Sequence, residues 1–399
     1  MAKKESKIKS KLLSRYGILV IVGIICVSLI AISAVALLSR GNTPEIPDDD
    51  SVVQTPEPNP NPESPPTPEP VQDDTPEPTP EPTPEPAPYL GPTNPLTGLP
   101  MDEEKARMRP IAISINNIRE ALPSNGTSSV DIAYEMPFEG GTTRILGVFQ
   151  DVTDIPKIGC IRSARHYSVF IAESHDAILV SVGGSTWAEA LIKDQVVPHI
   201  GESGAGLQVL RRDPNRVPGQ NMGRLHSVVL LGERMKDWLP ERSFRTVHED
   251  GFDLGFKFVD DGTPHNGIDA VEAVVRFEGG KTSTFKYDPE SNTYGFYQFN
   301  GAAIDANNNK QPAFTNIIVI QTSISSLTGP YGGSGRRDII TTGSGDGYFM
   351  CGGKYVEINW QRDEKKPYRF TYKDGTEIEF GIGRTYIGIV PKSSEQIFR

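Results

Sequence analysis

The stretch Pro156-Lys-Ile-Gly-Cys-Ile-Arg-Ser-Ala-Arg-His-Tyr167 determines how the first folded part of this chain is interpreted. It follows an apolar segment, Ile145 to Phe149, and an acidic turn, and it leads into a predicted helix from Ser163 to Glu173. Arg162 and Arg165 are three residues apart, which places them on one face of a helix. Polar and cationic side chains at a strand-to-helix junction are typical of a ligand site.

The candidate ligand-binding residues are three arginines and one serine of this region: Arg144, Arg162, Ser163 and Arg165. A guanidinium group can hold a carboxylate or a phosphate through two parallel hydrogen bonds. The alternative is a set of internal ion pairs with the nearby acids Glu135, Glu139, Asp151 and Asp154. We expect Arg162 or Arg165 to border a concave surface with spare donors, whereas two fully paired and buried guanidiniums would make the motif structural.

The segments around this stretch alternate between predicted strands and predicted helices. Short apolar runs predict strands at 111–115, 131–135, 143–150 and 177–182, and helices are predicted at 163–173, after Ser185 and at 227–239. Ser163 is a possible cap of the first helix, and Ser185 is a plausible N-cap, with Glu189 in the first turn of its helix. This rhythm predicts an α/β domain over residues 94–250.

Past residue 250 the pattern changes to short alternating runs. Segments 271–277, 282–287 and 293–299 predict a β-meander, and further strands are predicted at 317–321 and between 347 and 390. We interpret Gly343-Ser-Gly-Asp-Gly347 as a turn. Residues 251–399 are therefore predicted to form a mainly antiparallel β domain, and the fold class as a whole is α+β.

The N-terminal region predicts a membrane anchor. Residues 1–16 are rich in lysine, and residues 17–38 form an uncharged run whose length fits the ~20 residues of a transmembrane helix. The lysines before the run and the acids after it orient the N-terminus to the cytoplasm and the rest to the outside. Cleavage as a signal peptide at Ala34-Val-Ala36 is the alternative, but the run is longer than the apolar core of such a peptide.

Residues 41–93 predict a disordered spacer rich in Pro, Glu and Thr, with repeats such as Thr75-Pro-Glu-Pro78. Proline removes backbone donors and fixes φ, so this segment should be extended rather than folded. The whole chain of 399 residues has a formal net charge of −11, and the part after the spacer is mildly acidic. Nucleic acid is therefore excluded as an expected partner, because its binding requires a basic surface.

Two catalytic hypotheses remain as alternatives. Gly159-Cys-Ile-Arg162 resembles the Gly-Cys-x-Arg core of L,D-transpeptidases, but such a thiol needs a histidine, and none precedes His166. Glu135 and Glu139 are a possible carboxylate pair for glycoside cleavage. We expect no catalytic residue and no cofactor.

We also expect no metal ion, because the histidines show no ligand spacing and the calcium-like Asp305-x-Asn307-x-Asn309 lacks a downstream acid. The three cysteines, Cys26, Cys160 and Cys351, are expected to be free thiols, with pairing of the last two left open.

Several motifs carry a family resemblance: Asn94-Pro-Leu-Thr-Gly98, Arg109-Pro-Ile-Ala112, the Ile-Arg-Ser-Ala-Arg motif at 161–165, the glycine-rich 343–347 and Ile358-Asn-Trp360. They resemble the YerB-like family of extracytoplasmic lipoproteins of Gram-positive bacteria, built from two adjoining domains of unknown function. The likeness covers residues 94–392 and implies a cell-envelope protein without a settled activity. The chain departs from the family at Cys160, where proline is usual, and at Cys26, because Ile25 before it disfavours lipidation.

These observations together predict a single-pass membrane protein, anchored through residues 17–38, whose folded part is extracellular. The predicted function is non-catalytic binding of a cell-wall fragment, an anionic ligand or an envelope partner. A peptidoglycan-processing enzyme, transpeptidase-like or glycosidase-like, is the alternative.

Overall fold

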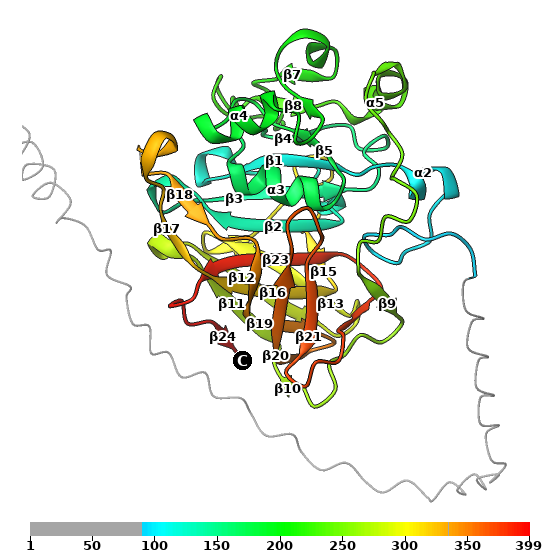
Figure 1. Ribbon diagram of the computed structural model, residues 1–399, viewed down its shortest axis with the longest axis vertical. Helices are drawn as coiled ribbons and strands as arrows, with labels where there is room; N and C mark the ends of the chain where they lie inside the picture. The colour runs from blue at the N-terminus through cyan, green and yellow to red at the C-terminus, as the bar shows by residue number, and fades with distance from the viewer. Residues whose placement is uncertain (1–89, 334) are drawn as a thin grey trace, which may run out of the picture. The chain divides into compact units, whose positions relative to one another are not determined.

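The computed structural model describes residues 90–333 and 335–399 (Figure 1). The predicted transmembrane segment 17–38 and nearly all of the predicted spacer lie outside the described residues. Over the described ranges, no helix has both the length and the apolar character needed to cross a bilayer.

Residues 90–250 form strands with four short α-helices. The strands are β1 (Ile111–Asn117), β2 (Ile132–Pro137), β3 (Thr143–Phe149), β4 (Ile158–Gly159), β5 (Ile178–Val180), β6 (His199–Ile200), β7 (Leu210–Arg212) and β8 (Val228–Leu230). The helices are α2 (Glu103–Arg107), α3 (His166–Ser174), α4 (Thr186–Lys193) and α5 (Gly232–Trp238). As predicted, Ser185 caps α4, because its side chain accepts a hydrogen bond from the amide of Ala188.

The rest of the described chain is built almost entirely of strands. They are β9 (Lys257–Val259), β10 (Ile268–Asp269), β11 (Glu272–Arg276), β12 (Thr282–Asp288), β13 (Thr293–Gln298), β14 (Gly301–Ala302), β15 (Ala313–Phe314), β16 (Asn316–Thr322), β17 (Ile324–Ser326), β18 (Arg337–Ile339), β19 (Gly343–Cys351), β20 (Lys354–Arg362), β21 (Arg369–Tyr372), β22 (Glu379–Gly381), β23 (Thr385–Pro391) and β24 (Ile397–Phe398). The fold is thus mixed α/β with mostly strands and few helices, as the sequence predicted at the level of class.

One eleven-stranded sheet runs through both halves of the chain, in the order β10-β20-β19-β16-β23-β2-β3-β1-β5-β6, with β21 paired to β20. The halves join where β23 pairs in parallel with β2, from Ile132 opposite Thr385 to Glu135 opposite Gly388. Figure 1 shows β23, near the C-terminal end, lying between β2 and β16. The two predicted domains therefore share a sheet instead of having one each.

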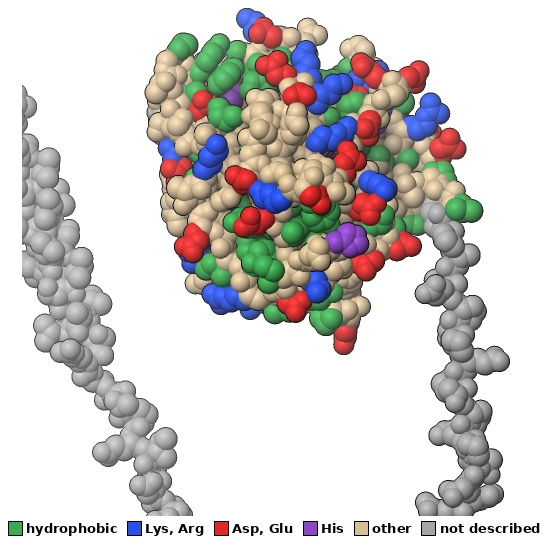
Figure 2. Space-filling model, turned by 60° about the horizontal axis from the view of Figure 1, so that its bottom comes forward, with side chains coloured by type: hydrophobic (Ala, Val, Ile, Leu, Met, Phe, Trp, Pro, Cys, Tyr) green, Lys and Arg blue, Asp and Glu red, His purple; other side chains and the backbone are tan. Residues whose placement is uncertain are grey.

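A second sheet, in the order β14-β13-β12-β11-β24 with β15 beside β13, packs on the first through aromatic side chains. The ring of Phe285 lies 4.3 Å from that of Tyr386 and 5.3 Å from that of Phe296, measured between centroids. These antiparallel pairings of β11, β12 and β13 confirm the predicted meander. On the face shown in Figure 2, basic and acidic side chains are interspersed.

Two sequence predictions in the first half are wrong in detail. Helix α3 begins at His166, with Arg165 as its N-cap residue, so Ser163 lies before the helix and does not cap it. The predicted helix at 227–239 is instead strand β8 followed by α5. The buried run Val228-Val-Leu230 pairs with β4 and β7, and this tertiary pairing outweighs the helical period.

The glycine-rich 343–347 segment is not a turn but the first half of β19. Its glycines allow close packing: a Cβ on Gly345 would lie 2.8 Å from the indole of Trp360, and one on Gly347 would lie 2.3 Å from the carbonyl oxygen of Val319. A glycine-rich sequence is typical of a turn when it is considered alone. Here the lack of side chains at the glycines allows close contact within a sheet.

Two Phe-Glu-Gly-Gly turns, 138–141 and 277–280, meet where the halves join. A Cβ on Gly279 would lie 2.3 Å from the Cα of Gly141, and both glycines have positive φ. Only glycine satisfies both conditions without strain. Thr143 and Ser283, which both donate hydrogen bonds to Glu135, follow these two turns in β3 and β12.

Glu135, on β2, is fully buried and is the polar centre of this junction. Its carboxylate oxygens accept hydrogen bonds from Asn117 Nδ2 (2.9 Å), Thr143 Oγ1 (2.5 Å), Ser283 Oγ (2.7 Å) and Tyr386 OH (2.8 Å). Lys281 Nζ lies 3.3 Å from Oε1. A buried carboxylate is tolerated only when it is both paired and hydrogen-bonded, and here both conditions hold.

We predict that Glu135→Gln lowers the free energy of unfolding by about 3–5 kcal/mol, because it leaves the Lys281 charge buried and unpaired. Urea unfolding of the full chain would measure this loss. The double variant Glu135→Gln/Lys281→Met should be more stable than Glu135→Gln alone, because no unpaired charge remains. Strictly additive effects of the two substitutions would contradict the pairing.

Candidate functional site

Two of the three predicted arginines, Arg144 and Arg165, lie over the ring of Phe138. The Cζ atoms of Arg144 and Arg165 lie 3.6 Å and 3.9 Å from the centroid of its ring. Arg165 also donates from Nε and Nη2 to the two carboxylate oxygens of Glu139, each at 2.8 Å. Arg165 is therefore held in a bidentate ion pair, which is the structural alternative that the sequence left open for it.

Arg144 is in a different situation, because its side chain is buried without an ion pair among the described residues. It is 9 % exposed, its Nη1 donates to the carbonyl oxygen of Ser163, and its Nε has no hydrogen-bond partner there. Burial, together with the nearby charge of Arg165, lowers the pKa of Arg144 to about 9. The guanidinium is still charged at neutral pH, but its charged form is poorly compensated.

Arg162 lies in the extended segment before α3 and is half-buried. Its Nη1 donates to the carbonyl oxygen of Leu225 at 3.1 Å, and within the described ranges it forms no ion pair. It lies close enough to His226 that burial and the Arg162 charge both lower the pKa of that imidazole. The prediction of Arg162 and Arg165 on one helical face is wrong, because the helix begins after both residues.

Ser163 serves as a support for these arginines. Its carbonyl oxygen accepts hydrogen bonds from Arg144 and from Ser114 Oγ, and its own hydroxyl donates to the carbonyl oxygen of Val182 at 3.2 Å. We call Arg144, Arg162, Ser163, Arg165, Phe138 and Glu139 the arginine cluster. It combines three guanidinium groups with one carboxylate and therefore has an excess of positive charge.

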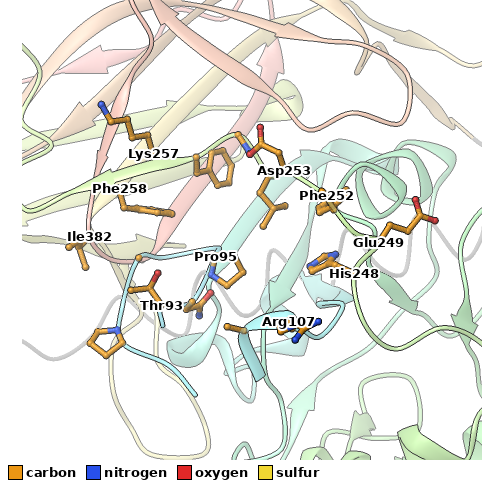
Figure 3. Close-up of a pocket in the computed structure, with 18 of the residues that line it drawn as sticks. Thr93, Pro95, Arg107, His248, Glu249, Phe252, Asp253, Lys257, Phe258 and Ile382 are labelled. Carbon is orange, nitrogen blue, oxygen red and sulfur yellow. The ribbon is translucent and has the colours of Figure 1, made fainter. Parts of the chain in front are cut away.

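Neither Arg162 nor Arg165 lines any of five surface cavities in the described part of the chain, so the expected concave surface is not at these residues. The largest of these, about 1050 Å³, lies elsewhere, between residues 93–107 and 247–260 (Figure 3). Phe252 and Phe258 line it together with the charged side chains of Arg107, Asp253 and Lys257. The sequence analysis missed this cavity because residues 247–260 show no periodic pattern.

The motif arginine Arg109 and the histidine at this cavity, His248, meet at Asp176. Arg109 Nη2 lies 3.1 Å from Asp176 Oδ1, Arg245 donates to both carboxylate oxygens at 2.7 Å, and His248 Nδ1 lies 3.2 Å from Oδ2. Burial alone would raise the pKa of Asp176, but the hydrogen bonds from His248 and Arg245 hold it well below its ordinary value. Arg109 is therefore a structural residue.

The residues of the two catalytic hypotheses are placed unfavourably for catalysis. Cys160 is fully buried, and burial raises the pKa of its thiol even though Arg216 and Arg162 act in the opposite direction. Glu135 is sealed in the core, and Glu139 is held by Arg165. Cys160 and Cys351 are both free and buried, so they do not pair.

The calcium-like segment at 305–309 is held by hydrogen bonds of Asp305 to residues 126 and 128, and we call these contacts the Asp305 latch. The Asp305 carboxylate accepts from the backbone amides of Gly126 and Ser128, both at 2.9 Å, and from Ser128 Oγ at 2.7 Å. These donors satisfy the carboxylate and tie residues 305–310 to residues 124–129. Among the described residues, no group of three or more His, Cys, Asp or Glu side chains is arranged to hold a metal ion.

The protein is thus a two-domain mixed α/β protein, and its arginine cluster has more guanidinium groups than carboxylates. Residues 96–236 match the N-terminal domain of the family described as "Protein of unknown function (DUF3048)", and residues 273–387 match its C-terminal domain. The chain belongs to this YerB-like family of two adjoining domains.

One relative, seen both in its sequence and in its crystal structure, resembles the chain over most of its length. The chain is 27 % identical over 304 residues to "Putative lipoprotein YerB" of Bacillus subtilis (strain 168), which covers 74 % of this chain and 86 % of the relative. The crystal structure of the YerB protein from Bacillus subtilis has a TM-score of 0.65 at 24 % identity, covering 77 % of this chain and 99 % of that one. At this identity the structural match shows the fold.

We predict that Cys160 in the native chain reacts with iodoacetamide at least about tenfold more slowly than in the denatured chain, because burial disfavours the reactive thiolate. Peptide mapping by mass spectrometry would measure the rate at this residue separately from the other two cysteines. Modification of native Cys160 as fast as in the denatured chain would support a nucleophilic role.

Proposed function

We propose that this chain is a membrane-anchored extracytoplasmic protein of the cell envelope that binds an anionic group at the arginine cluster without catalysing a reaction. The observation that carries the proposal is Arg144, a nine-tenths buried guanidinium with no ion-pair partner among the described residues. A buried charge of this kind is stabilised by an anion that supplies the missing compensation.

The other members of the cluster suit this role. Arg165 is neutralised and fixed by Glu139, so the excess positive charge of the cluster belongs to Arg144 and Arg162. Arg162 is half-buried, and its single recorded hydrogen bond, from Nη1, leaves other N–H donors for a ligand. A carboxylate of a peptidoglycan fragment and a phosphate of a wall polymer both match this chemistry.

The cellular location is part of the proposal. The relative from Bacillus subtilis is named as a putative lipoprotein, which suggests a membrane-anchored protein facing the outside. In this chain the uncharged run at 17–38 would replace the lipid, and the spacer at 41–93 would hold the folded part away from the bilayer.

We predict that Arg162→Ala weakens binding of muropeptides by about tenfold, or roughly 1.4 kcal/mol. Its stability should change by less than about 0.5 kcal/mol, because Arg162 forms no ion pair within the described ranges. Calorimetric titration of the full chain in nanodiscs with muropeptides, and separately with teichoic acid, would distinguish a carboxylate from a phosphate ligand. Arg162→Lys should recover only part of the affinity, because lysine lacks the planar fork.

Arg276→Ala is the matched control, because Arg276 is an exposed arginine on β11 that lies outside the cluster. It removes the same charge and should leave the affinity unchanged within about twofold, since exposed charges contribute little. An equal loss in both variants would indicate nonspecific attraction. Unchanged affinity in Arg162→Ala would contradict the proposed site.

The topology has its own test. Protease added to protoplasts should cut within residues 41–93 and release the folded part, because an extended proline-rich chain is accessible. The cut is followed with antibodies against the folded part and against the first sixteen residues. Protection of the spacer until the membrane is opened would reverse the proposed orientation.

A further inference from the structure

A partly open apolar cavity lies at the junction of the two halves, apart from the arginine cluster. Its volume is about 320 Å³. Ile115, Ala133 and Ile145 from the first half form one wall, and Phe296 and Phe314 from the second half form the other. Cavities of this size and character are typical of small-molecule sites.

One polar side chain in this apolar lining lacks a partner. Gln298, at the end of β13, is 8 % exposed, and its Oε1 forms no hydrogen bond to any described residue. A buried carbonyl oxygen without a partner costs about 1–3 kcal/mol, so a ligand that donates a hydrogen bond to it would remove this cost.

Two other polar residues at the cavity are already engaged. Asn117 and Tyr386 both line it, but both donate to the Glu135 carboxylate. Burial and the adjacent Glu135 charge raise the pKa of Tyr386 well above its ordinary value, so its hydroxyl remains a neutral donor to that carboxylate. Among the lining residues that the structure describes, Gln298 alone carries a buried side-chain atom without a hydrogen-bond partner, so it is the group that we expect a ligand to meet.

The walls are held in place by the Asp305 latch. Ser124 and Thr127 line the cavity on one side and Ala303 and Ile304 on the other, and Asp305 ties these two segments together. The cavity is therefore lined by segments that are hydrogen-bonded to one another, and not by a single loop.

We propose that this cavity binds a medium-chain aliphatic alcohol, with its hydroxyl on the Gln298 carboxamide and its apolar body between Ile145 and Phe296. A hydroxyl both donates and accepts, so it complements whichever amide atom faces the cavity. An engineered cavity of about 150 Å³ accepts benzene, so 320 Å³ fits an apolar body of roughly eight to ten carbons. This site extends beyond the proposed function and does not depend on it.

The probe for this site is 1-octanol, titrated into the full chain in nanodiscs. Carbon-13 labelled isoleucine methyl groups report the binding, because Ile115, Ile145 and Ile304 line the cavity. We expect these methyl signals to shift saturably. Methyl heptyl ether, an isomer without a hydroxyl donor, should bind about three- to tenfold more weakly, which corresponds to one hydrogen bond.

Three variants make the test specific. Ala303→Phe fills the cavity from a half-buried position and should weaken octanol binding by about tenfold or more. Ala190→Phe is the matched control, because Ala190, on α4, is also half-buried but does not line the cavity, and it should bind as the parent does. Gln298→Leu should bind octanol and the ether equally.

Two results would overturn the proposal. One is an octanol response that is the same in the parent chain and in Ala303→Phe, which would indicate partition into the lipid or onto the surface. The other is a Gln298→Leu variant that keeps the full preference for the alcohol. A variant that fails to fold is recognised by its isoleucine methyl spectrum, and Ala303→Leu then replaces Ala303→Phe.

Discussion

The buried pair of Glu135 and Lys281 is the interaction on which the joined fold depends. Glu135 belongs to the first half, and Lys281 and Ser283 belong to the second. A carboxylate sealed from water needs every one of these partners, so neither half satisfies its polar core alone. The family is described as two domains, but in this chain a buried ion pair links residues of both.

This constraint also positions the candidate sites. The Phe-Glu-Gly-Gly turn at 138–141 connects Glu135 on β2 to Arg144 on β3, so the same hairpin that carries the buried carboxylate presents the arginine cluster. On the other side of the sheet junction, Asn117 and Tyr386 contribute both to the Glu135 network and to the wall of the apolar cavity. The two candidate sites are separate in chemistry but share one structural support.

Strands and helices could be predicted from the sequence where a continuous apolar run or a capping residue marks them. The strands near 111–117 and 143–149 follow from continuous apolar runs, and the α4 helix follows from the Ser185 cap. The pairing of Ile132 with Thr385 was not predictable, because no local pattern encodes a contact between residues 253 positions apart. Fold class was therefore accessible from the sequence, and topology was not.

The candidate site shows the same division. The arginines were identified from their spacing, but Phe138 beneath two of them and the unpaired state of Arg144 depend on tertiary packing. The repeated Phe-Glu-Gly-Gly sequence was the one available signal for the junction, and a comparison of the chain with itself would have found it. Ser163 was misassigned because a serine before an apolar run looks like a helix cap, whereas its carbonyl oxygen is the atom that the arginine uses.

The place of β23 in the chain also determines when folding is completed during biosynthesis. This strand lies in the middle of the main sheet, yet it spans Thr385–Pro391, so β2 and β16 both have an open edge until synthesis has passed residue 385. Long-range pairing of this kind is slow, and open edges favour aggregation. A truncated product that ends before residue 385 lacks the strand that joins the two halves and leaves both edges exposed.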